Sequence, residues 1–533
     1  MKGWYATTVL LALVYLAVIW TLPVLPCQDL PQHLAYARIF IDHARPDLRF
    51  QEFYTLPERF EPYHTVYWLL AALARAVGSS SALRLVMSAY VLGTFGAFHA
   101  LVRSVWGRSP EPSWNTCLAV PLLWNPAVCM GLFSFALCIP IWLGGCACLL
   151  RARTPPHRAR HLVAVAVCCA ALASIHLVAA ACFALFAVIF AITGRTRMHV
   201  FSLMLTATVI AATTAAWSKL GGLGLAGHPI PSLADAVKRT DGLNFLDSIF
   251  HLVWSSPTVK TDYLLWTVLG PYRALNLLLL AAAFAAAIFV ASKARSRRAP
   301  ARTDARALPR DVRGASIGFA ALTLLAPRGC YVPTELTFID LRMMPLAFAL
   351  LLALIGPTWL ETTRARWALV LGSFVVALHF AFCAFGFGRE AAGPLRLQAK
   401  IPPTAVMESL PFHGRSAYFG TRFRLTESLP MYFTVKQGGI ATQFWARYTE
   451  HLPVDYAPGK RPPRAADSSP ATFASSHLDS VDYLLIQQAS AADDALAVQD
   501  AHRKARAILE DRATLVDCAG DWCLFATARV SSR

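Results

Sequence analysis

The chain has 533 residues, of which 56% are hydrophobic and 15% are charged. A soluble protein carries about a quarter charged residues, so this composition excludes an ordinary soluble protein and indicates a polytopic membrane protein. The formal net charge of +18 does not predict a nucleic-acid partner, because much of the positive excess lies in short loops between apolar segments, as in the cytoplasmic loops of membrane proteins. These basic positions are Arg151, Arg153, Arg158, Arg160, Arg195, Arg197 and the run from Lys293 to Arg313.

The first apolar run, Tyr5–Val24, is long enough to cross a bilayer. Lys2 precedes it and no small-residue cleavage site follows it, so we expect an anchor that is retained. Asp29 follows this span directly, with His33 close by, and Pro31 is placed to open a short helix at the membrane surface. Asp29 is either a carboxylate available for chemistry or the cap of that helix.

Eleven membrane spans are predicted from the apolar segments. Two apolar stretches are too long for one helix, and each is divided into a hairpin that turns at Asn125-Pro126 or at Ser174-Ile175-His176. The predicted spans are Tyr5–Val24, Ser81–Val102, Trp114–Asn125, Gly131–Leu150, His161–Ser174, Leu177–Thr193, His199–Ser218, Tyr263–Ala291, Gly314–Ala326, Met344–Leu360 and Trp367–Phe387.

Tyr63–Val77 is a further apolar segment, which we interpret as a re-entrant or interfacial helix. If it spanned the membrane, the basic loop 151–160 would fall outside, against the positive-inside rule, and Arg75 would be costly within the bilayer. The resulting topology places the N-terminus in the cytoplasm. The first loop (25–62), both hairpin turns, the loops 219–262 and 327–341 and the C-terminal part then lie on the outer side.

The fold class predicted is an all-α polytopic bundle over residues 1–389, followed by a small extracytoplasmic α/β domain over 390–533. In that domain the patterns predict a strand at 481–486, a helix at 491–511 and a hairpin of 514–518 with 523–528. A Cys518–Cys523 disulfide across the hairpin fits an oxidising compartment. Most other cysteines lie in or beside apolar segments and none forms a CxxC pair, so no zinc or redox site is predicted.

Several polar residues on the outer side suit the transfer of a sugar from a lipid-linked phosphate. Asp29 could take the proton of the acceptor. The departing phosphate needs cationic groups at headgroup depth, where Arg328 and Arg342 are expected. Asp340 could hold Arg342 in place or contact a sugar hydroxyl. The predicted substrate-binding residues are His33, His176, Arg328, Asp340 and Arg342.

Each of these residues also has an ordinary structural role as its alternative. Arg342 could extend to the lipid headgroups while Asp340 caps a helix. Arg328 could be an interfacial anchor, and His176 a turn residue.

The order of these features resembles the order found in a known superfamily. A first span is followed by an early Asp and by interfacial helices, and then by the pattern Gly78-x-Ser80 and Ala82-Leu83-Arg84. The run Gly131 to Leu137 (GLFSFAL), His176 and Asp340-Leu341-Arg342 extend the pattern. Over roughly residues 1–390 the chain resembles the C-type glycosyltransferase (GT-C) superfamily, polytopic enzymes that take sugars from polyprenyl- or dolichyl-phosphate carriers, and an uncharacterised bacterial group with that fold. The resemblance implies that Asp29, which matches the first-loop Asp, is the catalytic residue.

The chain departs from that pattern in its acidic residues. Many members have paired acids in the first loop, whereas Asp29 has no acidic neighbour before Asp42. The turn at 125–135, where some members carry a second acid, offers only Asn125 and Ser134. Because a divalent cation favours more than one carboxylate, no metal ligand is predicted and a divalent cation stays an open option.

The function predicted is a glycosyltransferase in the bacterial cytoplasmic (inner) membrane, using a lipid-linked sugar donor and a glycan, lipid or protein acceptor. One alternative is a non-catalytic scaffold or assembly component of the same architecture. Another is a lipid or glycan transporter, which the clustering of polar residues at one membrane face disfavours.

Overall fold

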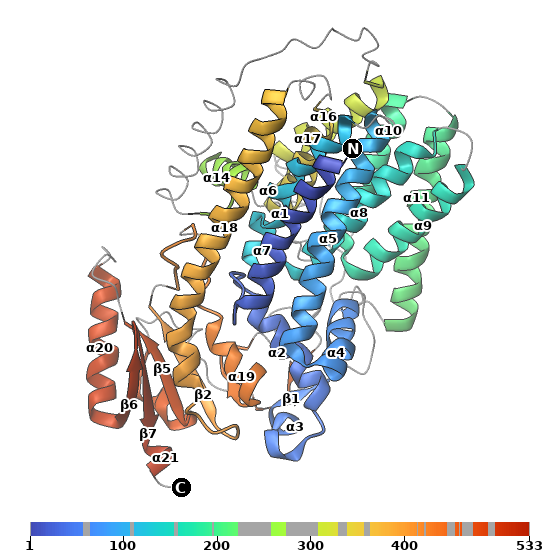
Figure 1. Ribbon diagram of the computed structural model, residues 1–533. Helices are drawn as coiled ribbons and strands as arrows, with labels where there is room; N and C mark the ends of the chain where they lie inside the picture. The colour runs from blue at the N-terminus through green and yellow to red at the C-terminus, as the bar shows by residue number, and fades with distance from the viewer. Residues whose placement is uncertain are drawn as a thin grey trace, which may run out of the picture.

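A computed structural model describes residues 2–56, 64–106, 111–153, 158–194, 197–221, 257–272, 308–328, 338–355, 363–412, 414–420, 423–444, 454–457, 459–460, 473–488 and 496–531. Long helices form a bundle, and an α/β domain lies at one end of it (Figure 1). We call this end the domain end, and the end at which the N-terminus lies the opposite end. Seven of the described helices are long and apolar enough to cross a membrane. They are α1 (Lys2–Thr21), α5 (Ser79–Trp106), α8 (Phe133–Arg151), α9 (Arg158–Ile175), α10 (Leu177–Gly194), α11 (Arg197–Gly221) and α18 (Thr363–Gln398).

The predicted count of eleven spans is not confirmed. The segments at 314–326 and 344–360 correspond to α16 (Arg310–Leu324) and α17 (Ile339–Ala353), which have 15 residues each. α14 (Pro257–Leu269) enters the predicted span 263–291, most of which lies outside the described residues, as does most of the loop 219–262. The segment 114–125 is not one α-helix. It consists of the 3-10 helix η3 (Glu111–Ala119) and the short α6 (Val120–Leu123), where Pro112 and Pro121 each lie in the first turn of a new segment.

Short helices lie at the domain end, around the loop that follows α1. As predicted, a helix begins next to Pro31: α2 (Leu30–Asp42) buries Tyr36, Ile39 and Phe40 on one face. It is followed by η1 (Pro46–Leu48), α3 (Phe50–Phe53) and β1 (Tyr54–Thr55). The segment 63–77, interpreted as an interfacial helix, forms α4 (Thr65–Val77), whose 13 residues are too few for an ordinary span. It buries Tyr67 and exposes Trp68.

The C-terminal domain is built on a five-stranded sheet of order β3-β2-β5-β7-β6. β2 (Val406–Pro411) is parallel to β3 (Ile440–Ala441) and β5 (Tyr483–Gln487), whereas β7 (Trp522–Thr527) is antiparallel to β5 and to β6 (Ala513–Ala519). α20 (Leu496–Arg512) covers a small core that includes Leu484, Ile486 and Leu509. The predicted disulfide between Cys518 and Cys523 closes the β6–β7 hairpin. The remaining short elements are α19 (Tyr432–Gln437), after η6 (Leu429–Met431), then β4 (Asp455–Tyr456), η9 (Ser475–Ser480) and α21 (Ala528–Ser531).

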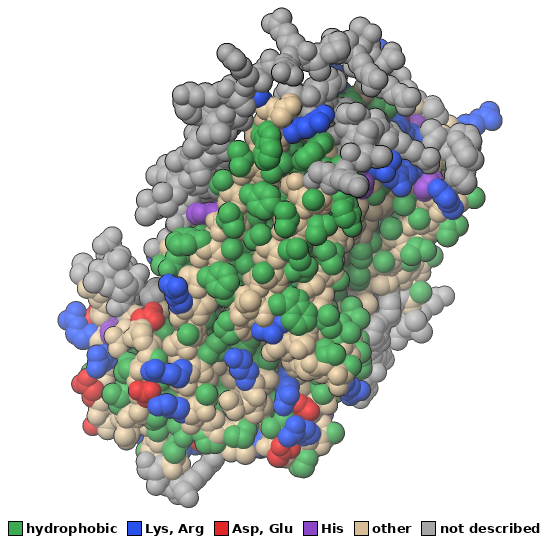
Figure 2. Space-filling view, in the orientation of Figure 1, with side chains coloured by type: hydrophobic (Ala, Val, Ile, Leu, Met, Phe, Trp, Pro, Cys, Tyr) green, Lys and Arg blue, Asp and Glu red, His purple; other side chains and the backbone are tan. Residues whose placement is uncertain are grey.

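The surface is apolar along the bundle and charged at its ends. In Figure 2 hydrophobic side chains cover the helices, Lys and Arg gather towards both ends, and acidic side chains are visible at the domain end. At the opposite end, Asp311 in the first turn of α16 accepts a hydrogen bond from Arg153 Nη1 at 2.8 Å and lies 3.0 Å from His199 Nε2. Of the predicted basic loop, the described residues Arg151, Arg153 and Arg158 therefore lie at the end away from the C-terminal domain (Figure 1).

Candidate functional site

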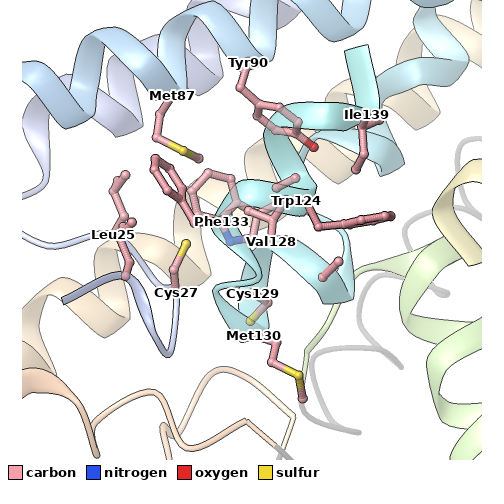
Figure 3. Packing of buried hydrophobic residues seen from close by; sticks show 14 of the residues in the cluster. Leu25, Cys27, Met87, Tyr90, Trp124, Val128, Cys129, Met130, Phe133 and Ile139 are labelled. Atoms are coloured by element: carbon pink, nitrogen blue, oxygen red, sulfur yellow. The ribbon is translucent and has the colours of Figure 1, made fainter. Parts of the chain in front are cut away.

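The loop that carries Asp29 is fixed against α7 (Pro126–Met130) by backbone hydrogen bonds. The Gln28 N–H donates to the Cys129 carbonyl at 2.8 Å and the Asp29 N–H to the Met130 carbonyl at 3.3 Å. α7 is itself capped by Asn125, whose Oδ1 accepts from two backbone N–H groups. Leu25 and Cys27, which lead up to Asp29, pack with Met87 and Phe133 in the apolar core (Figure 3). The segment around Asp29 is thus packed against the bundle.

The Asp29 carboxyl does not cap α2. Asp29 occupies the N-cap position, but its side chain makes no capping hydrogen bond. The side chain is buried, and its Oδ1 atom has no hydrogen-bond partner among the described residues. Burial raises the pKa of Asp29 well above its usual range, a side-chain hydrogen bond with Gln28 opposes this shift, and the charge of Glu427 adds to it. Asp29 is therefore not a simple helix cap.

His33 connects the Asp29 loop to two other elements. Its Nε2 lies 3.0 Å from the Gly131 carbonyl, which can only accept, so Nε2 carries the proton. Nδ1 then accepts from the Tyr67 hydroxyl at 2.7 Å. Burial lowers the pKa of His33 to about 4, so the ring is neutral at physiological pH. Both ring nitrogens are used within the protein, and the substrate-binding role of His33 stays a prediction.

His176 and Arg342 form a second centre. His176 lies between α9 and α10, as predicted for a hairpin turn, and is buried with its ring 5.5 Å from that of Phe135. Burial lowers the pKa of His176, and the charge of Arg342, in the first turn of α17, lowers it further. The histidine is therefore neutral, and the guanidinium supplies the positive charge of this centre.

Arg328 and Asp340 lie at the start of α17 together with Arg342. The Arg328 carbonyl accepts from the Ile339 N–H at 2.9 Å, and its exposed guanidinium lies 5.3 Å from the centre of the Phe338 ring. Asp340 is fully buried and its Oδ1 accepts from the Leu341 N–H at 2.8 Å. The structure thus gathers these three predicted residues, although their contacts with substrate stay predictions.

The two centres are neighbours, joined by α8 and α4. In the first turn of α8, Phe133 contacts His33 and Phe135 contacts His176. At the start of α4, Thr65 Oγ1 donates to the Ser174 carbonyl at 2.8 Å, and Tyr67 binds His33. Neither Arg328 nor Arg342 is among the groups that shift the pKa of Asp29.

No sequence pattern predicts the residues that approach the Asp29 loop from the C-terminal domain. Gln28 Oε1 accepts a hydrogen bond from the Arg424 N–H at 2.9 Å, and Arg424 Nη1 lies 3.2 Å from Glu427 Oε1. Glu427 is thus an acidic residue of the C-terminal domain whose charge acts on Asp29. No spacing or motif in the sequence connects it with Asp29. Within the described ranges, no three His, Cys, Asp or Glu side chains are grouped so as to hold a metal ion.

The arrangement of a helical bundle, short helices after α1 and an α/β domain at the same end is shared with a solved structure. The chain can be superposed on the crystal structure of ArnT from Cupriavidus metallidurans in the apo state with a TM-score of 0.53, 12% identity and coverage of 98% of each chain. For ArnT bound to undecaprenyl phosphate the TM-score is 0.49, again at 12% identity, with 99% of this chain and 98% of that chain covered. No protein-family model matches the sequence, and the curated proteins give no match either. At this identity the likeness to ArnT shows the fold alone.

Proposed function

We propose that this protein is a membrane glycosyltransferase that moves a sugar from a polyprenyl-phosphate-linked donor to an acceptor at the outer face of the cytoplasmic membrane. The observation that carries the proposal is the Asp29 carboxyl. It is buried, its pKa is raised, and its position at the end of the first span serves no capping role. A carboxylate of raised pKa is a stronger base than an ordinary one, which suits proton abstraction from an acceptor.

The positive charge of Arg342 and Arg328, in the neighbouring centre, supports the proposed class of donor. Arg342 and Arg328 lie together at the start of α17, where a lipid phosphate at headgroup depth could bind them. ArnT, whose fold this chain shares, has been crystallised with undecaprenyl phosphate. We infer the same class of lipid carrier for this chain.

The orientation is supported from both ends of the bundle. The basic loop with Arg153 and Arg158 lies at the opposite end, which is the cytoplasmic side by the positive-inside rule. The Cys518–Cys523 disulfide lies at the domain end, and disulfides persist in oxidising compartments such as the periplasm. We therefore assign the domain end, with Asp29, to the outer face.

The proposed reaction needs one base and one set of cations. Asp29 takes the proton of the acceptor nucleophile, which attacks the anomeric carbon as the bond to the phosphate oxygen breaks. Arg342 and Arg328 stabilise the charge on the departing polyprenyl phosphate. The products are the glycosylated acceptor and the polyprenyl phosphate.

A panel of labelled polyprenyl-phosphate sugars tests this function in proteoliposomes supplied with a cell-envelope extract. A glycosyltransferase consumes one donor and releases an equal amount of polyprenyl phosphate. A transporter moves the donor across the bilayer unchanged, and a scaffold does neither. Translocation without cleavage, or no consumption of any donor in the panel, would contradict the proposal.

A further inference from the structure

We propose that Glu427, carried by the C-terminal domain, is a positioning residue of the site: it is the second carboxylate, and it acts on Asp29 through Arg424 and Gln28. This inference rests on the proposed function, in which Asp29 is the base. It gives the C-terminal domain a direct role in a site whose other residues lie in the membrane bundle.

Glu427 is held in place by a segment that we call the strap, residues 414–420 and 423–428. At one end, the Gly420 N–H donates to the Pro271 carbonyl at 2.9 Å, and the Phe423 ring lies 4.8 Å from Trp266 of α14. At the other end, the Gly414 N–H donates to Gln487 Oε1 of β5 at 3.2 Å, and within the strap the Thr426 N–H donates to the Gly414 carbonyl at 3.1 Å. The strap is therefore anchored to the bundle on one side and to its own domain on the other.

The strap meets the Asp29 loop through Gln28. The backbone N–H of Arg424 donates to Gln28 Oε1 at 2.9 Å, and the Gln28 side chain also hydrogen-bonds to Asp29. The Arg424 guanidinium pairs with Glu427 at 3.2 Å. A continuous path of contacts thus runs from the buried Asp29 carboxyl to a partly exposed carboxylate and its cation.

Two other titratable groups near Asp29 carry no charge. Cys27 of the same loop and Tyr67 of α4 are buried, which raises the pKa of the thiol and of the phenol and keeps both neutral. His33, which binds Tyr67, is neutral as well. Glu427, on the strap, is the acidic group whose charge acts on Asp29. Its negative charge adds to burial in raising the pKa of Asp29.

The proposal predicts opposite effects for the two members of the ion pair. Glu427→Gln removes the negative neighbour, so Asp29 should ionise at lower pH. Arg424→Gln removes the cation that partly neutralises Glu427, so Asp29 should ionise at higher pH. The backbone N–H that holds Gln28 remains in both variants. A shift of about half a pH unit or more in each direction is expected for a like-charge neighbour at a buried carboxyl.

Labelling with dicyclohexylcarbodiimide measures the pH at which Asp29 ionises, because the reagent modifies protonated carboxyls. This measurement does not require turnover. The full-length protein in detergent is labelled across a pH series, and modification of the Asp29 peptide is followed by mass spectrometry. Asp517→Asn is the matched control, since Asp517 pairs with Lys400 in the same domain, away from the strap. We expect the pH at which half of Asp29 is labelled to fall for Glu427→Gln and to rise for Arg424→Gln. It should stay unchanged for Asp517→Asn.

Equal midpoints for Asp29 labelling in wild type, Glu427→Gln and Arg424→Gln would overturn the proposal. If one variant does not fold, the other decides the outcome by its shift from wild type. The acid limb of the pH–rate profile should move with the labelling midpoint, giving Glu427→Gln about threefold higher turnover than wild type on that limb for a shift of half a unit. Shifted labelling without any donor turnover would instead contradict the proposed function and leave the role of Glu427 in place.

Discussion

Gly131 lies against Asp29 so closely that no side chain fits between them. A Cβ atom on Gly131 would stand 2.8 Å from the Asp29 Cβ and would overlap the Asp29 backbone. Gly131 also has a φ of +87°, a conformation that favours glycine. The carbonyl of the same residue binds His33. One glycine thus determines how near the first loop approaches α7 and α8.

Gly131→Ala should therefore displace Asp29. The left-handed conformation alone costs about 1–2 kcal/mol for a residue with a Cβ, and the overlap with the Asp29 backbone adds to it. We expect a lower melting temperature in detergent and a loss of donor turnover of tenfold or more. Gly96→Ala, within α5, is the control, because a Cβ there has no atom within 4 Å and alanine is the better helix former. Equal stability and activity of the two variants would show that Gly131 does not position the loop.

Arg342→Gln should weaken donor binding. A charge-assisted hydrogen bond contributes about 1.5–3 kcal/mol, so its loss should raise the KM for the lipid-linked donor by about 10- to 100-fold. The control is Arg197→Gln, at the start of α11 and at the opposite end of the bundle. Steady-state kinetics in proteoliposomes give the KM of each variant. An unchanged KM for Arg342→Gln would remove this residue from the donor site and favour a structural role beside His176.

The location of the C-terminal domain can be tested through its disulfide. Cys518 and Cys523 are bonded to each other, so an impermeant maleimide should label them in intact spheroplasts only after reduction. A cysteine introduced at Arg197, at the opposite end, should react only once the membrane is permeabilised. Labelling of Cys518 that also requires permeabilisation would reverse the proposed orientation and place Asp29 in the cytoplasm.

Local sequence patterns predicted much of the architecture. Pro31 and the spacing of Tyr36, Ile39 and Phe40 predicted α2, and the break at Ser174-Ile175-His176 marks the turn between α9 and α10. The strand at 481–486 and the hairpin at 514–528 are β5, β6 and β7. These features depend on neighbours in sequence, so periodicity and turn residues are sufficient to find them.

The composition of the site could be predicted only in part. Arg328, Asp340 and Arg342 are close in sequence, and the structure gathers them at the start of α17. Glu427 is brought towards Asp29 because the C-terminal domain packs on the bundle. The hydrogen bond between Arg424 and Gln28 joins residues 396 positions apart, which no local pattern encodes. The prediction of a single span at 114–125 is wrong for another reason. Hydropathy measures apolar content and does not distinguish a 3-10 helix from an α-helical span.

The most direct measurement of the central claim is the rate at which Asp29→Asn releases polyprenyl phosphate from the donor that wild type consumes. The amide keeps the shape of the side chain and removes the base, so we expect a loss of about 100-fold or more at equal incorporation into liposomes. Asp47→Asn, an exposed carboxylate in the same outer loop, is the control and should retain full activity. If Asp29→Asn releases polyprenyl phosphate as fast as wild type, Asp29 is not the base, and the account of this site is wrong.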